Sequence, residues 1–275
     1  MTALPGNTLW RRQMPYAQVN SQKLYYEDTG GSGPAVVFSH GLLMDQSMFA
    51  PQVAALKDRY RCISWDERGH GRTAGDALPP FSYYDSADDL AALLKHLGVE
   101  KAVLAGMSQG GYLSLRCALT HPQIVRALIL IDTQALPEDP AKMPGYKQMM
   151  DIWATQGLPD PIADTVEQII LGQNWPGSAA WKAKWRTWKA VNLLQCFQTL
   201  GGRDDISPKL GQIKVPALVV HGDIDMAISL DRAKAMAEGL PQATLAVIKG
   251  GGHAANLTHP DQVNPHIEKF LAGLH

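Results

Sequence analysis

The sequence predicts an α/β protein built on a mostly parallel central sheet flanked by helices. Short runs rich in Val, Ile and Leu recur along the 275 residues, and segments of helical periodicity separate them. Most of these runs are apolar throughout, which is typical of strands covered on both faces. Strands that alternate with helices usually pair in parallel, with helices on both sides of the sheet.

The strands and helices are expected at defined positions. We expect strands at 22–28, 35–39, 61–65, 101–106, 127–132, 216–221 and 243–248. We expect helices near 46–57, 84–97, 109–120, 229–239 and 261–273. Only the short turn TGGSGP separates the first two strands, so we expect these two to form an antiparallel pair.

Residues 134–212 break the alternation of strands and helices. They contain no convincing strand but several helical stretches. A structureless loop of this length is improbable in a compact domain. We therefore predict a helical cap, 134–212, inserted into an α/β core domain of residues 1–133 and 213–275.

The predicted cap is rich in tryptophan. Five of the seven tryptophans lie in it: Trp153, Trp175, Trp181, Trp185 and Trp188. The last three are spaced i, i+4, i+7, which places them on one face of a helix. This face either packs on the core or forms an aromatic wall over a substrate pocket. In the second interpretation, Trp153 and Trp185 are candidate substrate-binding residues.

Composition and charge limit the possible partners. The chain is 45% hydrophobic and 19% charged with a formal net charge of −1, which favours neither nucleic acid nor an anionic membrane. Lys182, Arg186 and Lys189 form a basic stripe on a predicted helix, and we expect a solvated face there. The N-terminus lacks a secretory signal pattern, and no apolar run approaches a membrane span. We expect a soluble, cytoplasmic monomer or homodimer.

Cysteine and histidine usage gives no sign of a disulfide framework or a metal. Cys62, Cys117 and Cys196 are far apart and odd in number, and their apolar surroundings favour burial over a role as thiol nucleophile. The nine histidines show no paired ligand spacing. No dinucleotide-binding or phosphate-binding glycine motif follows a predicted strand, so no cofactor is implied.

One pentapeptide carries the main chemical signal. Residues 106–110, GMSQG, match G-x-S-x-G between a predicted strand and a predicted helix. The simplest interpretation is a turn whose Ser108 caps the helix. The alternative is a nucleophile on a turn too tight for side chains beside it, close to helix amides that favour a developing anion.

A serine nucleophile needs a base and a third group that orients the base. On this kind of sheet the expected chain order is Ser, then Asp or Glu, then His. Asp223 and Asp225 are the best-placed carboxylates after Ser108, and His253 is the best-placed histidine, on a Gly-rich loop after the last strand.

Four separated motifs resemble those of the α/β-hydrolase superfamily. His40-Gly41 resembles the oxyanion loop, and residues 66–71, DERGHG, resemble the D-x-R-G-x-G turn. GMSQGG is similar to the nucleophile elbow. The G-x-x-D of residues 222–225 and the Gly-His of residues 252–253 resemble the acid and base loops.

The resemblance implies a role for several residues. Ser108 would attack an acyl carbonyl, His253 would act as base, and Asp225 would orient the imidazole. The backbone amides of Leu42 and Gln109 would form the oxyanion hole. Serine rather than aspartate at the elbow argues against relatives that form alkyl esters. The implied reaction is hydrolysis of a small-molecule carboxylic ester or lactone, as in small bacterial esterases and enol-lactone hydrolases.

Each assignment has a rival. Asp223 is the nearest alternative acid, and Asp132 lies where some family members carry theirs; the G-x-x-D spacing favours Asp225. His259 is an alternative base, but it directly precedes the proline that opens the last predicted helix, which favours His253.

Other motif residues are expected to be structural. His40 shapes its loop, while Asp66 and Arg68 stabilise a turn. The family often has an acidic residue five positions after the catalytic histidine, where Thr258 stands here. This difference leaves the three triad residues unchanged.

The sequence predicts the substrate less well than the fold or the triad. The cap contains Met143, Met149 and Met150 beside its tryptophans, which favours an apolar acyl or aromatic group. Carbon–carbon bond hydrolysis, thioester hydrolysis and peracid formation use the same triad. A non-catalytic receptor of this fold is the hypothesis from another class.

Overall fold

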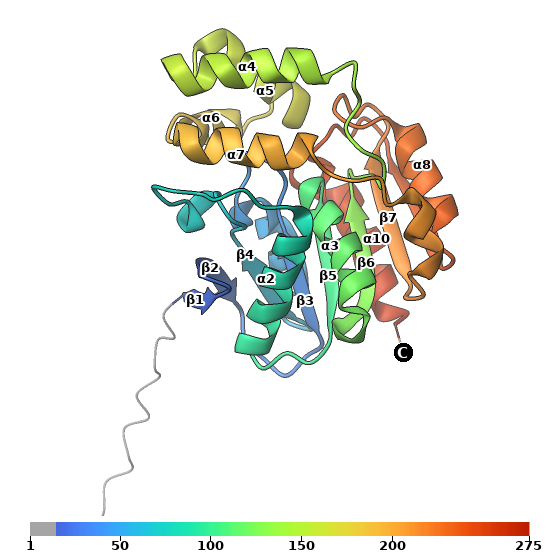
Figure 1. Ribbon diagram of the computed structural model, residues 1–275. Helices are drawn as coiled ribbons and strands as arrows, with labels where there is room; N and C mark the ends of the chain where they lie inside the picture. Colours follow the sequence, from blue (N-terminus) through green and yellow to red (C-terminus); the bar gives the residue numbers. More distant parts are fainter. Residues whose placement is uncertain (1–14, 275) are drawn as a thin grey trace, which may run out of the picture.

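The computed structural model describes residues 15–274, and its eight-stranded sheet is covered by helices on both faces (Figure 1). The strand order is β1-β2-β4-β3-β5-β6-β7-β8. The strands are β1 (Tyr16–Val19), β2 (Gln22–Asp28), β3 (Ala35–Ser39), β4 (Arg61–Trp65), β5 (Ala102–Met107), β6 (Val125–Ile131), β7 (Ala217–Gly222) and β8 (Ala243–Ile248). Strands β3 to β8 are parallel, and β2 is antiparallel to β1 and β4. The N-terminal segment, on which the expectation about a secretory signal rests, lies largely outside the described residues.

The helices form a layer on each side of the sheet. They are η1 (Gln46–Phe49), α1 (Ala50–Leu56), η2 (Gly71–Thr73), α2 (Tyr83–His96), α3 (Gln109–Thr120), η3 (Pro122–Ile124), α8 (Leu230–Gly239), α9 (Ala255–Thr258) and α10 (Pro260–Ala272). Helices α2 and α3 pack together in front of the sheet in Figure 1, and α10 lies behind it with α1. Every residue of β3, β5 and β7 is buried, as expected of strands covered on both faces. The predicted fold class is confirmed.

The expected antiparallel pairing of 22–28 with 35–39 is wrong. Strand β2 pairs with β4, with Tyr26 opposite Trp65, while β3 lies between β4 and β5. The fully buried β3 occupies the middle of the sheet, where both of its edges are hydrogen-bonded. Strand β2 exposes Lys23 and Glu27 and lies near the edge. The four-residue β1 was not predicted.

The segment between β6 and β7 is helical. It contains α4 (Met143–Gln156), α5 (Asp160–Ile170), α6 (Ser178–Trp185), α7 (Ala190–Gly201) and η4 (Ser207–Gln212). Figure 1 shows α4 to α7 stacked across the top of the molecule, and we call these four the insertion helices.

The predicted tryptophan face is only partly formed. Helix α6 ends at Trp185, so Trp188 lies beyond it, and the three rings do not share one helix. The Thr187 hydroxyl donates to the carbonyl of Lys184, which competes with continued helical bonding at this end. Trp181 and Trp185 are buried in the hydrophobic core, which supports the packing interpretation.

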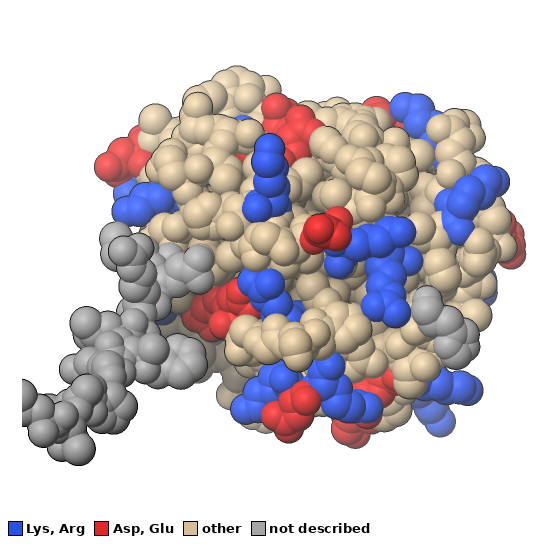
Figure 2. Space-filling view, turned by 90° about the horizontal axis from the view of Figure 1, so that it is seen from below, with Lys and Arg blue, Asp and Glu red and all other residues tan. Residues whose placement is uncertain are grey.

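Charges of both signs are mixed over the surface. Figure 2 shows Lys and Arg interspersed with Asp and Glu on the face seen from below. Lys182, Arg186 and Lys189 each pair with a carboxylate. No helix within residues 15–274 has the length and apolar character needed to cross a membrane.

The turn between β5 and α3 leaves no space for side chains beside the serine. A Cβ added to Gly106 would lie 2.1 Å from the carbonyl oxygen of Gly110. A Cβ added to Gly110 would lie 1.9 Å from the carbonyl oxygen of Ser39, at the end of β3. These contacts are with backbone atoms, which cannot move aside without distorting the sheet.

We therefore expect Gly110→Ala to lower the free energy of unfolding by at least about 2 kcal/mol, since overpacking a rigid contact is costly. Gly145→Ala is the matched control. Gly145 lies in α4 with nothing within 4 Å of an added Cβ, and alanine there should stabilise by roughly 0.5 kcal/mol. Chemical denaturation of both variants checks this, and equal stabilities would contradict it.

Candidate active site

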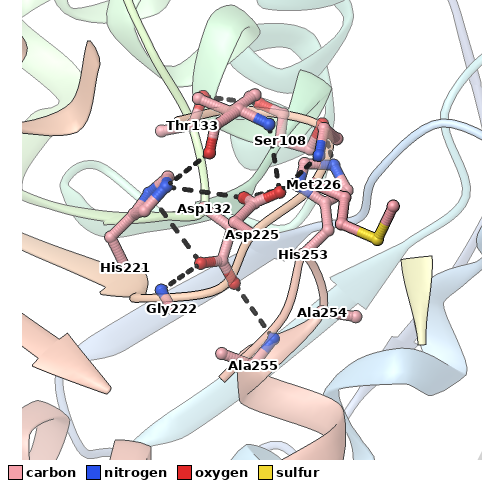
Figure 3. A network of polar contacts seen from close by, with 12 residues as sticks. Ser108, Asp132, Thr133, His221, Gly222, Asp225, Met226, His253, Ala254 and Ala255 are labelled. Atoms are coloured by element: carbon pink, nitrogen blue, oxygen red, sulfur yellow. Dashed lines mark hydrogen bonds and ion pairs between the residues drawn. The ribbon is translucent and has the colours of Figure 1, made fainter. Parts of the chain in front are cut away.

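The three residues of the predicted triad lie side by side at the ends of strands β5, β7 and β8 (Figure 3). Ser108 makes no side-chain cap to α3; instead its Oγ lies 3.1 Å from Nε2 of His253. Nδ1 of His253 lies 2.8 Å from Oδ2 of Asp225. The structure thus forms a continuous hydrogen-bonded chain through Ser108, His253 and Asp225.

The surroundings of Asp225 define the direction of these hydrogen bonds. Burial alone raises the pKa of a carboxyl group, but the charge and hydrogen bond of His253 hold the pKa of Asp225 below its ordinary value. Its Oδ1 accepts hydrogen bonds from the amides of Ala227 and Ile228. The ionised carboxylate therefore accepts the Nδ1 proton of His253. Nε2 of the same imidazole is left to accept the proton of the Ser108 hydroxyl.

The rival residues have other partners. Asp223 accepts a hydrogen bond from the amide of Gly250 at the surface. His259 lies 2.9 Å from the Thr258 hydroxyl. Asp132 is completely buried, but both of its oxygens accept backbone amide protons. The geometry therefore favours Asp225 and His253 over their alternatives.

The predicted oxyanion amides lie on two loops beside Ser108. Gln109 begins α3, so its amide has no intrahelical acceptor. In the described part of the chain, neither this amide nor that of Leu42 donates a hydrogen bond to another residue. Both Leu42 and Ser108 line the same pocket. Among the described residues, these two backbone N–H groups beside Ser108 thus remain without an acceptor.

His40 holds the loop that carries Leu42. Its Nδ1 donates to the carbonyl of Gly41 and its Nε2 accepts from the amide of Glu67, which fixes one tautomer. Burial lowers the pKa of His40, in keeping with a neutral ring. The residue is structural, as expected.

The other turn residues are structural as well. Asp66 accepts hydrogen bonds from the amides of Gln46 and Arg72, and Arg68 pairs with Asp89. These bonds fix the turn after β4.

The pocket above Ser108 is small and mainly apolar. Its volume is about 90 Å³, and its lining includes Leu42, Leu43, Tyr112, Glu138, Tyr146, Met149, Met150, Val166, Ile169, Ile170, Phe197, Leu200, Ala227 and Ile228. Glu138 is the one carboxylate among the lining residues, and it is paired with the buried Arg203.

The proposed substrate contacts of Trp153 and Trp185 are wrong. Neither residue lines the pocket. Both are buried in the core, and the indole N–H of Trp185 donates to the carbonyl of Leu43 behind the pocket wall. The neighbouring Met149 and Met150 of α4 line the pocket instead.

One cluster has the composition of a metal site. Asp132, His221 and Asp225 place ligand atoms within 4.8 Å of one another. However, both oxygens of Asp132 accept backbone amides, and Asp225 is bonded to His253. Nε2 of His221 donates to the carbonyl of Ile228. Nδ1 of His221 has no partner among the described residues, but the carboxylate oxygens and Nε2 are engaged within the protein, so the set fits a hydrogen-bonded network better than a metal.

The three cysteines are free and buried, as the sequence indicated. Burial raises the pKa of the Cys62 and Cys117 thiols to about 12, which leaves them protonated at neutral pH.

The family model for the alpha/beta hydrolase family matches residues 36–266, which include all four motifs. The chain belongs to the alpha/beta hydrolase family. The match spans the strands that carry Ser108, Asp225 and His253, so the whole site lies within the family's domain.

Related proteins and structures agree with this membership. The chain is 31% identical to the AB hydrolase superfamily protein YisY of Bacillus subtilis, over 90% of this chain and 94% of that one. It is 28% identical to a protein of Agrobacterium fabrum that carries the name carbamate hydrolase RutD, over 88% and 95%. The crystal structure of the enol-lactonase from Burkholderia xenovorans matches with a TM-score of 0.86 at 26% identity, covering 94% of this chain and 100% of that one. A thermophilic esterase from Thermogutta terrifontis matches with a TM-score of 0.84 at 26% identity, over 95% and 97%.

This hydrolase also contains a buried polar network that sequence reasoning missed. The side chain of Gln109 points away from the pocket and donates to Glu67 and to Nε2 of His70. Its carbonyl oxygen accepts from the Tyr83 hydroxyl at 3.3 Å. The side chain of the residue after Ser108 is therefore held by three hydrogen bonds on the side away from the pocket.

Glu67 gives this network an unusual pH dependence. Its side chain is 1% exposed, and Oε1 has no partner within the described residues. Burial raises the pKa of Glu67 from 4.5 to about 8, so it is mainly protonated at neutral pH. The folded state holds this proton more tightly than the unfolded chain. The resulting stabilisation is complete below pH 4.5 and is lost as the pH rises through about 8.

We therefore expect Glu67→Gln, which cannot ionise, to gain stability relative to the wild type as the pH rises from 4.5 to 8. The slope should reach at most about 1.4 kcal/mol per pH unit. Denaturant unfolding at several pH values measures the difference. Glu238→Gln, at an exposed position of α8, is the control for the same chemical change. A pH-independent difference between the wild type and Glu67→Gln would contradict the burial argument.

Proposed function

We propose that this alpha/beta hydrolase cleaves carboxylic esters or lactones of small, mainly apolar molecules through an acyl-serine intermediate. The observation that carries the proposal is the hydrogen-bonded chain from Ser108 through His253 to the ionised Asp225, at the base of an apolar pocket. This is the arrangement that activates a serine hydroxyl.

In the proposed reaction Nε2 of His253 takes the hydroxyl proton as Oγ of Ser108 attacks the carbonyl carbon. The carbonyl oxygen becomes negative and accepts hydrogen bonds from the amides of Leu42 and Gln109. His253 then gives its proton to the leaving alcohol, and the acyl-serine remains. A water molecule repeats the attack with His253 as base, which releases the acid and restores the serine.

The pocket supports a small apolar acyl group. Burying methylene groups against Met149, Met150 and Ile170 is favourable by about 0.8 kcal/mol for each CH₂. A cavity of about 90 Å³ leaves little room for a long chain. The insertion helices would then act as a cap that excludes water from the acyl-enzyme.

A carbamate is the second candidate substrate. It is favoured by the relatives that carry the name carbamate hydrolase, at 28% identity across most of the chain. Thioesters and β-diketones complete the panel, because the same triad can act on them. A carbon–carbon hydrolase differs by releasing a carbonyl compound, so product analysis separates it.

We expect the protein to hydrolyse p-nitrophenyl acetate and butyrate with a higher kcat/KM than p-nitrophenyl palmitate. A fluorophosphonate should label Ser108, and Ser108→Ala should abolish labelling and lower turnover by at least about a thousandfold. Absorbance assays and peptide mass spectrometry measure these effects.

Ser114→Ala is the matched control, since Ser114 is a buried serine of α3, the helix that begins directly after Ser108, and its hydroxyl donates to the carbonyl of Gly110. It should keep both labelling and turnover. A wild type that is neither labelled nor active on any member of the panel would favour the receptor hypothesis.

A further inference from the structure

A pair of residues at the end of β6 contacts all three segments of the triad (Figure 3). Asp132 and Thr133 are completely buried and belong to neither the triad nor the pocket lining. Asp132 has a positive φ of 45°, which is uncommon outside glycine. Such strain, held in place by surrounding contacts, is a feature of functional sites.

The carboxylate of Asp132 connects the acid loop to the base loop. One oxygen accepts the amide proton of Gly222 at 2.9 Å, three residues before Asp225. The other accepts the amide proton of Ala255 at 3.0 Å, two residues after His253. A single side chain therefore holds the two loops whose residues must meet at 2.8 Å.

Thr133 makes the corresponding contact to the nucleophile. Its hydroxyl donates to the carbonyl of Ser108 at 2.8 Å. The amide of Ser108 donates to the carbonyl of Ile131, the last residue of β6, at 2.9 Å. A Cβ added to Gly111 would lie 2.5 Å from the Thr133 side chain, so the third glycine of the elbow makes room for this threonine.

We propose that Asp132 and Thr133 form a positioning unit that sets the distances between Ser108, His253 and Asp225. This inference rests on the proposed function, because it assigns a catalytic consequence to the alignment of those three residues. Neither residue of the unit touches the substrate. Each acts through the backbone of a segment that carries a catalytic residue.

The physical reason lies in the topology of the site. Ser108 and His253 are 145 residues apart, and each follows a different strand. Strand register alone leaves loops free to shift, and a displacement of about 1 Å in a catalytic group can cost a hundredfold in rate. The backbone bonds of Asp132 and Thr133 restrict these loops at the point where alignment matters.

Opposing effects act on the protonation of Asp132. Burial and the nearby Asp225 raise the pKa of Asp132. The two amide bonds favour its ionised form and oppose that effect. His221 also faces the group, with Nδ1 3.8 Å from the Asp132 carboxylate. The position of the Asp132 side chain thus depends on the amides of Gly222 and Ala255, and the positions of the two loops depend on Asp132 in turn.

Asp132→Asn tests the carboxylate. Asparagine tolerates a positive φ, but its amide group keeps one acceptor and turns an N–H₂ toward the other backbone amide. Asp66→Asn is a matched control, because Asp66 is 2% exposed and also accepts two backbone amides, those of Gln46 and Arg72, outside the triad segments. Both variants should lose similar amounts of thermal stability.

The expected difference lies in catalysis. Asp132→Asn should lower both kcat for p-nitrophenyl butyrate and the rate of fluorophosphonate labelling of Ser108 by at least about tenfold, with KM changed less than about twofold. Asp66→Asn should change both rates by less than about twofold.

Thr133→Val and Thr133→Ser test the hydroxyl independently. Valine keeps the shape and removes the donor to Ser108, so labelling and kcat should fall by about tenfold, whereas serine should keep them within about twofold. Wild-type rates in both Asp132→Asn and Thr133→Val would overturn the inference, as would an equal loss in Asp66→Asn. A wild type that fluorophosphonate does not label would instead overturn the proposed function.

Discussion

The arrangement of the whole site depends on the backbone turn at Ser108. Its φ of 50° and ψ of −114° lie outside the regions that suit a residue with a side chain, at a cost of roughly 1–3 kcal/mol. Hydrogen bonds on both sides of the residue oppose this cost: the amide donates to Ile131, and the carbonyl accepts from Gly111, Tyr112 and Thr133. The turn directs the hydroxyl toward His253 rather than toward the helix it precedes.

The buried polar groups around this turn follow one principle. Glu67, Asp132 and His40 are nearly or fully buried, and each makes hydrogen bonds that join loops from different strands. A buried polar group without partners is costly, so such bonds select one arrangement of the loops. The three triad residues are therefore positioned by the sheet and its loops, and the insertion helices supply much of the apolar pocket lining.

The sequence was informative where the signal was local or ordered along the chain. Apolar runs located the strands of the parallel sheet, and the order of Ser108, Asp225 and His253 identified side chains that the structure brings together. Strand pairing failed because the turn between 28 and 35 carries no information on where β3 lies in the sheet. The strongest local sequence signal was the G-x-S-x-G match at residues 106–110, which lies at the turn between β5 and α3.

Other features depend on packing that no spacing rule reveals. Met150 and Trp153 are three positions apart on one side of α4, and the packing of α4 against α7 and its other neighbours decides which of them reaches the pocket. Glu67 and Gln109 meet across 42 residues because two adjacent loops converge behind the elbow. Thr133 gave no sequence signal of its own, and only the structure shows that the third glycine of GMSQGG makes room for it.

The most direct test of the account is a crystal structure of the protein after reaction with a short-chain alkyl fluorophosphonate. We expect phosphorus bonded to Oγ of Ser108, one phosphoryl oxygen within about 3 Å of the amide nitrogens of Leu42 and Gln109, and the alkyl group among the side chains of α4. An adduct on another residue, or a phosphoryl oxygen that points away from both amides, would contradict it.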